Sequence, residues 1–191
     1  MKMKPNKKET HTKRAKKKDI LKEINSDEAR NILMILIEKD KKISAIVKQI
    51  AKQVLSSVDV DKVANDIYFD LNNIAVEDVW DNSGGTRGGY VEPDELAGEM
   101  FEEALDQFLE ELKRYQDLSM HTEAKIVCMG ILKGLHKFKK ESTTGFRDYV
   151  EDAPQEYAEI VFDSWKKGSK NSKDKKEIED FMKKCGFQKN Y

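Results

Sequence analysis

Apolar residues along this chain recur mostly at the three- and four-residue spacing of an amphipathic helix. In residues 42–57 the apolar positions leave one face of the predicted helix polar. Residues 60–74 repeat the pattern, and Asp59 or Asp61 is the expected N-cap. Both segments therefore predict helices that pack on one side only.

The helix predicted at residues 26–40 has a different pattern. After an expected N-cap at Ser26, the run ILMILI at residues 32–37 is apolar without a break. A helix that is apolar all round is normally a buried one. We therefore expect this helix to be covered on most sides.

The second half of the chain continues with four predicted helices. Pro93 suits the first turn of the longest one, which runs to about Leu118. In residues 123–138 apolar positions surround the axis, which predicts a central helix, and Gly130 and Gly134 allow a neighbouring helix to come close. Further helices are expected from Pro154 and over residues 173–186, where Gly186 follows the last turn.

These patterns indicate an all-α fold with six or seven helices. Alternating strand patterns are absent, and three prolines in 191 residues leave the helices few breakers. Short breaks between helices favour an antiparallel bundle or a stack of helical hairpins. We expect a basic arm at residues 1–18, one helical domain at residues 19–165, and a lysine-rich linker with a short helix at residues 166–191.

Charge is divided unevenly along the chain, although the net charge is −1. Residues 1–18 carry nine bases and one acid, residues 75–111 carry twelve acids and one base, and residues 166–191 carry nine lysines and four acids. A basic arm of this kind neutralises nucleic-acid phosphates, but this one has no aromatic residues for base stacking. The alternatives are a solubilising tail or an arm that docks on the acidic middle. The candidate nucleic-acid residues are Lys13, Arg14, Lys16, Lys17 and Lys18.

The glycine-rich stretch WDNSGGTRGGYVEPDE, residues 80–95, lacks the Lys-Ser/Thr of a phosphate-binding loop and the spacing of a dinucleotide fingerprint. Its single RGG is a weak RNA signal. We interpret it as a connecting loop whose ends, Trp80 and Tyr90, are fixed in the core, with Arg87 at the exposed tip. Because long connections are often binding elements, contact with a partner is the alternative.

Acidic residues lie on the outer face of the long helix that follows, and they are expected to be solvated. Such a face could still select a basic partner. The candidate partner-binding residues are therefore Trp80, Arg87, Tyr90, Glu99, Glu102 and Asp106.

Metal, cofactor and catalytic motifs are missing from the sequence. His121, Cys128, His136 and Cys185 have ligand chemistry but no zinc-site spacing, and Glu-x-x-His and G-x-S-x-G motifs do not occur. We expect the two cysteines to be inert core residues and the protein to hold no metal or cofactor. With neither a signal-peptide pattern nor a bilayer-length apolar run, we expect a cytoplasmic protein without a membrane segment.

The segment YVEPDELAGEMFEEALDQFLEELKRYQDLSMHTEAKIVCMGILKGL, residues 90–135, resembles the helical-hairpin region that accompanies SWIM zinc fingers, which is itself similar to tetratricopeptide hairpins. The resemblance is one of pattern and spans about residues 30–140. The resemblance implies an α-hairpin scaffold that binds other macromolecules. The C-x-C and C-x-H pairs of the SWIM finger are absent, so zinc binding and the finger's nucleic-acid role do not carry over.

Together these observations predict a non-catalytic helical scaffold for protein–protein interaction. The alternative is a nucleic-acid-associated protein that binds through the basic arm. A third hypothesis is an enzyme with a site at the centre of the bundle. The oligomeric state stays open.

Overall fold

A computed structural model describes residues 19–86 and 89–187. These residues form α-helices, one 3-10 helix and one two-stranded hairpin, which confirms the all-α class. The chain divides into two compact units, Met1–Val54 and Leu55–Tyr191, where the sequence predicted one helical domain over residues 19–165. The predicted arm at residues 1–18 lies outside the described residues.

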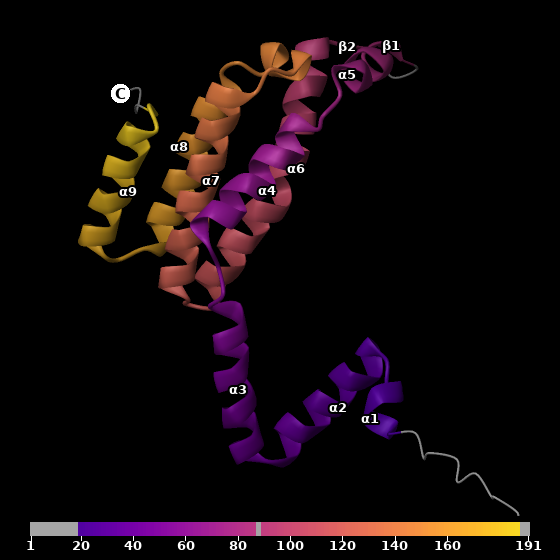
Figure 1. Cartoon of the computed structure of the whole chain (residues 1–191), viewed down its shortest axis with the longest axis vertical. Coiled ribbons are helices and arrows are strands. Elements are labelled where there is room, and N and C mark those ends of the chain that lie inside the picture. The colour runs from indigo at the N-terminus through magenta and orange to yellow at the C-terminus, as the bar shows by residue number, and fades with distance from the viewer. Residues whose placement is uncertain (1–18, 87–88, 188–191) are drawn as a thin grey trace, which may run out of the picture. The chain divides into compact units, whose positions relative to one another are not determined.

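The N-terminal unit consists of successive short helices. They are α1 (Ile20–Glu23), α2 (Ser26–Lys39) and α3 (Lys41–Leu55), which ends one residue beyond the unit (Figure 1). Asn25 rather than Ser26 caps α2, because its side chain accepts from the Glu28 N–H while Glu28 accepts from the Asn25 N–H.

The predicted burial of α2 is wrong for the isolated chain. No residue of α2 is buried, and residues 32–36 of the apolar run are each 40–51% exposed. The pattern is apolar all round, but no other described element of the unit covers the helix. Nothing buried occurs in α1 or α3 either.

The larger unit begins with α4 (Val60–Asn72), which Asp59 caps as one of the two predicted alternatives. A short helix, α5 (Val76–Asn82), and a hairpin of β1 (Gly84–Thr86) and β2 (Gly89–Val91) follow. The hairpin replaces the plain loop expected here, and it pairs Gly84 with Val91 and Gly85 with Tyr90. Gly84 and Gly89 have φ of +90° and +137°, a region that favours glycine.

Four longer helices complete this unit. They are α6 (Pro93–Asp117), α7 (His121–Glu141), α8 (Ala153–Gly168) and α9 (Ser172–Lys184), with a 3-10 turn at Gly145–Tyr149 between α7 and α8. Prolines stand in the first turns of α6 and α8 as predicted. All seven predicted helices are present. The described residues add only α1 and α5, which are too short to show a helical period.

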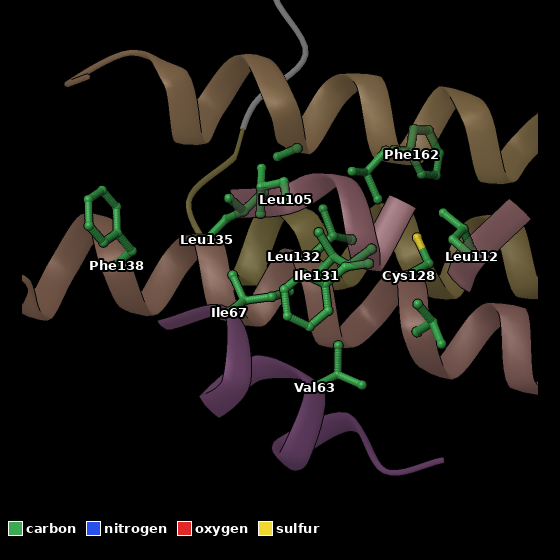
Figure 2. Close-up of a cluster of buried hydrophobic side chains, with 14 of the residues drawn as sticks. Val63, Ile67, Leu105, Leu112, Cys128, Ile131, Leu132, Leu135, Phe138 and Phe162 are labelled. Atoms are coloured by element: carbon green, nitrogen blue, oxygen red, sulfur yellow. The ribbon is translucent and has the colours of Figure 1, made fainter. Parts of the chain in front are cut away.

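Helix α7 lies at the centre of the larger unit and contacts α4, α6, α8 and α9 (Figure 1). Helices α6 to α9 alternate in direction, as short connections predict. Figure 2 shows the side chains that surround α7, including Ile67 from α4, Leu105 from α6 and Phe162 from α8. The prediction of a central, apolar helix is therefore confirmed.

The closest packing in this unit joins α4 to α7 through two glycines. A Cβ atom placed on Gly130 would lie 2.6 Å from Val63 Cβ, and one on Gly134 would lie 2.8 Å from Ile67 Cβ. The contacts advance in step along both helices, so α4 and α7 run parallel. This confirms the predicted close approach, although the partner is not a neighbour in sequence.

The C-terminal helix α9 also belongs to this core rather than to a separate tail. Ile178, Met182 and Phe187 are buried. Gly186 has φ of +75°, and the Phe187 N–H donates to the Met182 carbonyl oxygen, so the glycine ends the helix as predicted.

Candidate functional site

Exposed apolar residues concentrate in the N-terminal unit. Ten of the fifteen large apolar residues that are exposed in the described chain lie between residues 20 and 54. They are 40–76% exposed, and they are Ile20, Leu21, Ile32, Leu33, Met34, Ile35, Leu36, Ile46, Ile50 and Val54. So many exposed apolar residues within one segment are typical of a surface that another molecule covers.

Helix α3 adds a sharp division between its two sides. Ile43, Ile46 and Ile50 share one face at helical spacing, whereas Lys48 and Lys52 point to the opposite side. The side facing away from the apolar stripe is thus suited to water. An amphipathic helix of this kind packs its apolar face against another surface and leaves its polar face in water.

Trp80 in α5 and Tyr90 in β2 are at the surface, so their predicted place in the core is wrong. Trp80 is 54% and Tyr90 is 67% exposed. The Trp80 indole Nε1–H donates to the Tyr149 hydroxyl at 2.9 Å, which fixes the ring across the outside of the fold. Flanking glycines let the hairpin turn at the surface, so neither ring is drawn inward. Arg87 lies outside the described residues.

The predicted acidic face is present on α6. Glu99, Glu102 and Asp106 are all exposed on one side of the helix. On α8, partial burial and the charge and hydrogen bond of Glu102 raise the pKa of Tyr157 to about 12, so its hydroxyl stays neutral at physiological pH. Among the described residues, Trp80 and Tyr90 make no hydrogen bond with these carboxylates.

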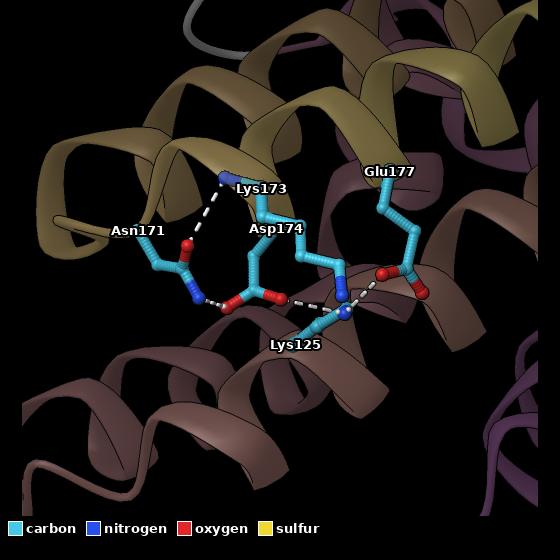
Figure 3. Close-up of polar contacts among 5 residues, drawn as sticks. All are labelled: Lys125, Asn171, Lys173, Asp174 and Glu177. Carbon is cyan, nitrogen blue, oxygen red and sulfur yellow. Dashed lines mark hydrogen bonds and ion pairs between the residues drawn. The ribbon is translucent and has the colours of Figure 1, made fainter.

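A polar cluster that sequence reasoning missed connects α7 to α9 (Figure 3). The Lys125 Nζ contacts Asp174 Oδ1 at 2.8 Å and Glu177 Oε2 at 2.7 Å, and Asn171 donates to the other Asp174 oxygen. Lys125 lowers the pKa of Asp174. The two carboxylates in turn raise the pKa of Lys125 against the opposing effect of its burial. No local motif could reveal it, because about fifty residues separate the partners.

His136 makes the matching contact at the other end of α9. Its Nδ1–H donates to the carbonyl oxygen of Cys185, the C-cap residue of α9. Its ring also packs edge-on against Phe187. His136 therefore contacts the C-terminal end of α9 rather than that of its own helix. Lys125 and His136 together hold α9 parallel to α7 as structural contacts.

The remaining candidate ligands do not converge. Cys128 and Cys185 are both buried, as predicted, and burial raises the pKa of each thiol. His121 is exposed at the start of α7. Across residues 19–86 and 89–187, no three His, Cys, Asp or Glu side chains are grouped as metal ligands.

The described hollows of the larger unit lie at its surface. One, of about 580 Å³, runs along α8 beside Glu156, Glu159 and Asp163 and is open to solvent. Another, of about 210 Å³, lies among Lys139 and Arg147 at the end of α7. Both are surface hollows, and the enzyme hypothesis stays a prediction.

Comparison with models of known protein families, with curated proteins and with solved structures found no match. The resemblance to helical hairpins beside SWIM fingers thus stays a prediction. None of the helices described combines the length and the apolar composition that crossing a bilayer demands. The candidate nucleic-acid residues Lys13, Arg14, Lys16, Lys17 and Lys18 lie outside the described residues.

Proposed function

We propose that this chain is a non-catalytic helical scaffold for protein–protein interaction, with α2 and α3 as its principal contact surface. One observation carries the proposal: helices α1 to α3 bury no residue, although they contain ten large exposed apolar residues. The larger unit, by contrast, has a well-packed core of its own. The two units therefore suit different tasks, one as a stable framework and one as an interaction element.

A photo-cross-linking amino acid placed at single positions of α3 tests this proposal in cells. We expect adducts from Ile46 and Ile50, on the apolar stripe, because a bound protein would lie against them. The matched positions Lys48 and Lys52, on the polar side of the same helix, should give few or none. No adducts at any position, or equal yields on both sides, would refute the proposal.

The exposed residues Trp80, Tyr90, Glu99, Glu102 and Asp106 offer further contact surfaces on the larger unit. The acidic face suits a basic partner by charge. The double substitution Glu102→Lys with Asp106→Lys reverses that charge at two exposed positions. A variant that kept every partner of the wild type would remove this face from the proposal.

Nucleic-acid binding through residues 1–18 is the second candidate, and its support is the net charge of +8 in that segment. Fluorescence anisotropy with labelled DNA and RNA would compare the full chain with one that begins at Asp19. Binding that needs the arm and weakens steeply with salt would favour this function. Equal behaviour of the two proteins would count against it.

A further inference from the structure

We propose that α2 and α3 are covered by the same helices of a second copy of this chain, arranged antiparallel about a two-fold axis near Met34. The inference rests on the proposed function, because it names the occupant of the surface described there. Four properties of residues 26–54 support it: the distribution of apolar residues, the exposed area, the charge pattern and the division of α3 into two sides.

The apolar residues of α2 favour a protein over a lipid surface. Six consecutive apolar residues, 32–37, place side chains on every side of this helix. An amphipathic helix on a membrane needs a distinct polar face, since the bilayer covers one side only. A helix that is apolar all round is covered fully only when other helices surround it.

The exposed area is sufficient for a stable pair. The ten exposed apolar residues leave on the order of 1,000 Å² open to solvent, against roughly 800 Å² that each partner contributes to a standard interface. Most of this area belongs to α2 and α3. One copy therefore presents enough apolar surface to hold another without any rearrangement of the larger unit.

The charges along α2 complement themselves when two copies run antiparallel. Arg30, Met34 and Glu38 follow one another at spacings of four residues within α2, so they lie along one side. An axis at Met34 places Arg30 of one copy opposite Glu38 of the other. A parallel pair would instead place like charges together.

The side of α2 that faces away from Arg30, Met34 and Glu38 carries Ile32, Leu33 and Leu36. This apolar side stays uncovered by the contact between the two α2 helices. The stripe of Ile43, Ile46 and Ile50 on α3 matches it in character. Two helical pairs that combine in this way form a four-helix bundle, in which each α2 is surrounded and each α3 keeps its lysines in water. This explains why α2 is apolar all round while α3 is apolar on one side.

The first experiment measures the molar mass of the full chain in solution by light scattering over a range of concentrations. We expect twice the 22.1 kDa of one chain. Met34→Lys should give the monomer mass, because it places two lysines across the axis, while lysine keeps the helix propensity of methionine. Gln49→Lys adds the same charge at an exposed position on the polar side of α3 and should remain a dimer.

The orientation is tested by charge exchange at Arg30 and Glu38. Arg30→Glu and Glu38→Arg should each weaken the dimer by roughly tenfold, because symmetry repeats the disrupted pair twice. The combined variant should restore it. These residues are eight apart on one helix and do not meet within a chain, so restoration would report contact between copies.

Cysteine cross-linking adds an independent readout, since both native cysteines are buried. Met34→Cys should cross-link to itself with a short bismaleimide. Arg30→Cys should cross-link only when mixed with Glu38→Cys, whereas a parallel pair would let Arg30→Cys cross-link to itself. The parallel result would overturn the proposed arrangement.

Other outcomes separate this inference from the proposed function. A monomer at every concentration, or a dimer that Met34→Lys leaves intact, would overturn the two-copy interface. If cellular cross-links from Ile46 then led to a different protein, the proposed function would stand while this inference fell. Sedimentation of the monomer with phosphatidylserine vesicles, lost on Met34→Lys, would overturn both in favour of a membrane surface.

Discussion

Replacing Gly130 or Gly134 by alanine should destabilise the larger unit, although alanine is the better helix former. A Cβ at Gly130 would lie 2.6 Å from Val63 Cβ and 3.2 Å from the Val60 carbonyl oxygen. One at Gly134 would lie 2.8 Å from Ile67 Cβ and 3.0 Å from the Ala64 carbonyl oxygen. The nearest atom in each case is a Cβ atom, which no rotamer change can move aside.

The magnitude follows from two opposing effects. Carbon atoms in contact sit about 3.5–4.0 Å apart, so α4 and α7 must separate by roughly 1 Å to admit one methyl group. Overpacking of this kind costs about 1–3 kcal/mol or somewhat more, whereas Gly→Ala in a helix gains about 1 kcal/mol. We expect each substitution to lower the free energy of unfolding by about 1–2 kcal/mol. In the double variant the loss should be less than the sum, because the first methyl group already moves the helices apart.

Gly98→Ala is the matched control. This glycine also lies within a helix, α6, but no atom comes within 4 Å of a Cβ placed there. The substitution should raise the free energy of unfolding by about 0.5–1 kcal/mol through helix propensity alone.

Urea denaturation followed by tryptophan fluorescence provides the assay, since both tryptophans, Trp80 and Trp165, belong to the larger unit. Gly130→Ala and Gly134→Ala should shift the midpoint to lower urea, while Gly98→Ala should shift it higher. If all three variants were stabilised alike, the contact between α4 and α7 would not be as close as we describe, and the reasoning would fail.

Further predictions concern α9, Tyr157 and Trp80. Lys125→Met should lower the free energy of unfolding by about 1 kcal/mol, because Asp174 and Glu177 lose a charge-assisted partner while staying partly in water. It should also increase hydrogen exchange in α9, and unchanged exchange there would contradict the role of this cluster. Because Lys125 holds the pKa of Asp174 below its ordinary value of 3.8, this contribution should be present above about pH 4 and be lost as the pH falls through the lowered value, a loss absent from Lys125→Met. Because the pKa of Tyr157 is raised to about 12, its contribution to stability should be fully present below the ordinary value of 10.0 and be lost as the pH rises from there to about 12. In an ultraviolet titration, the difference between the wild type and Tyr157→Phe should be one tyrosine that ionises late. Tyr149→Phe should alter the fluorescence of exposed Trp80 and leave that of buried Trp165 unchanged, because only Trp80 donates to the Tyr149 hydroxyl.

The sequence by itself determined the local features of this protein. Helical spacing and the first-turn prolines Pro93 and Pro154 depend on neighbours within one or two turns. They predicted six or seven helices, and every segment named as a helix is helical in the structure. The pair Gly130 and Gly134 also predicted a close contact between helices, because two glycines four residues apart leave one side of the helix without side chains. The acidic face of α6 followed from the same local periodicity.

Tertiary structure alone decided which elements meet. The sequence could not show that α4 is the helix packed on the two glycines, nor that Lys125 reaches Asp174 and His136 reaches the end of α9, since these pairs are distant along the chain. The sequence also predicted that Trp80, Tyr90 and α2 are buried, and this was wrong. Apolar character indicates that burial would be favourable, but it does not show which element would cover the residue. For α2 no described element of its own unit covers the apolar run at residues 32–37, and the pattern along the chain could not show this.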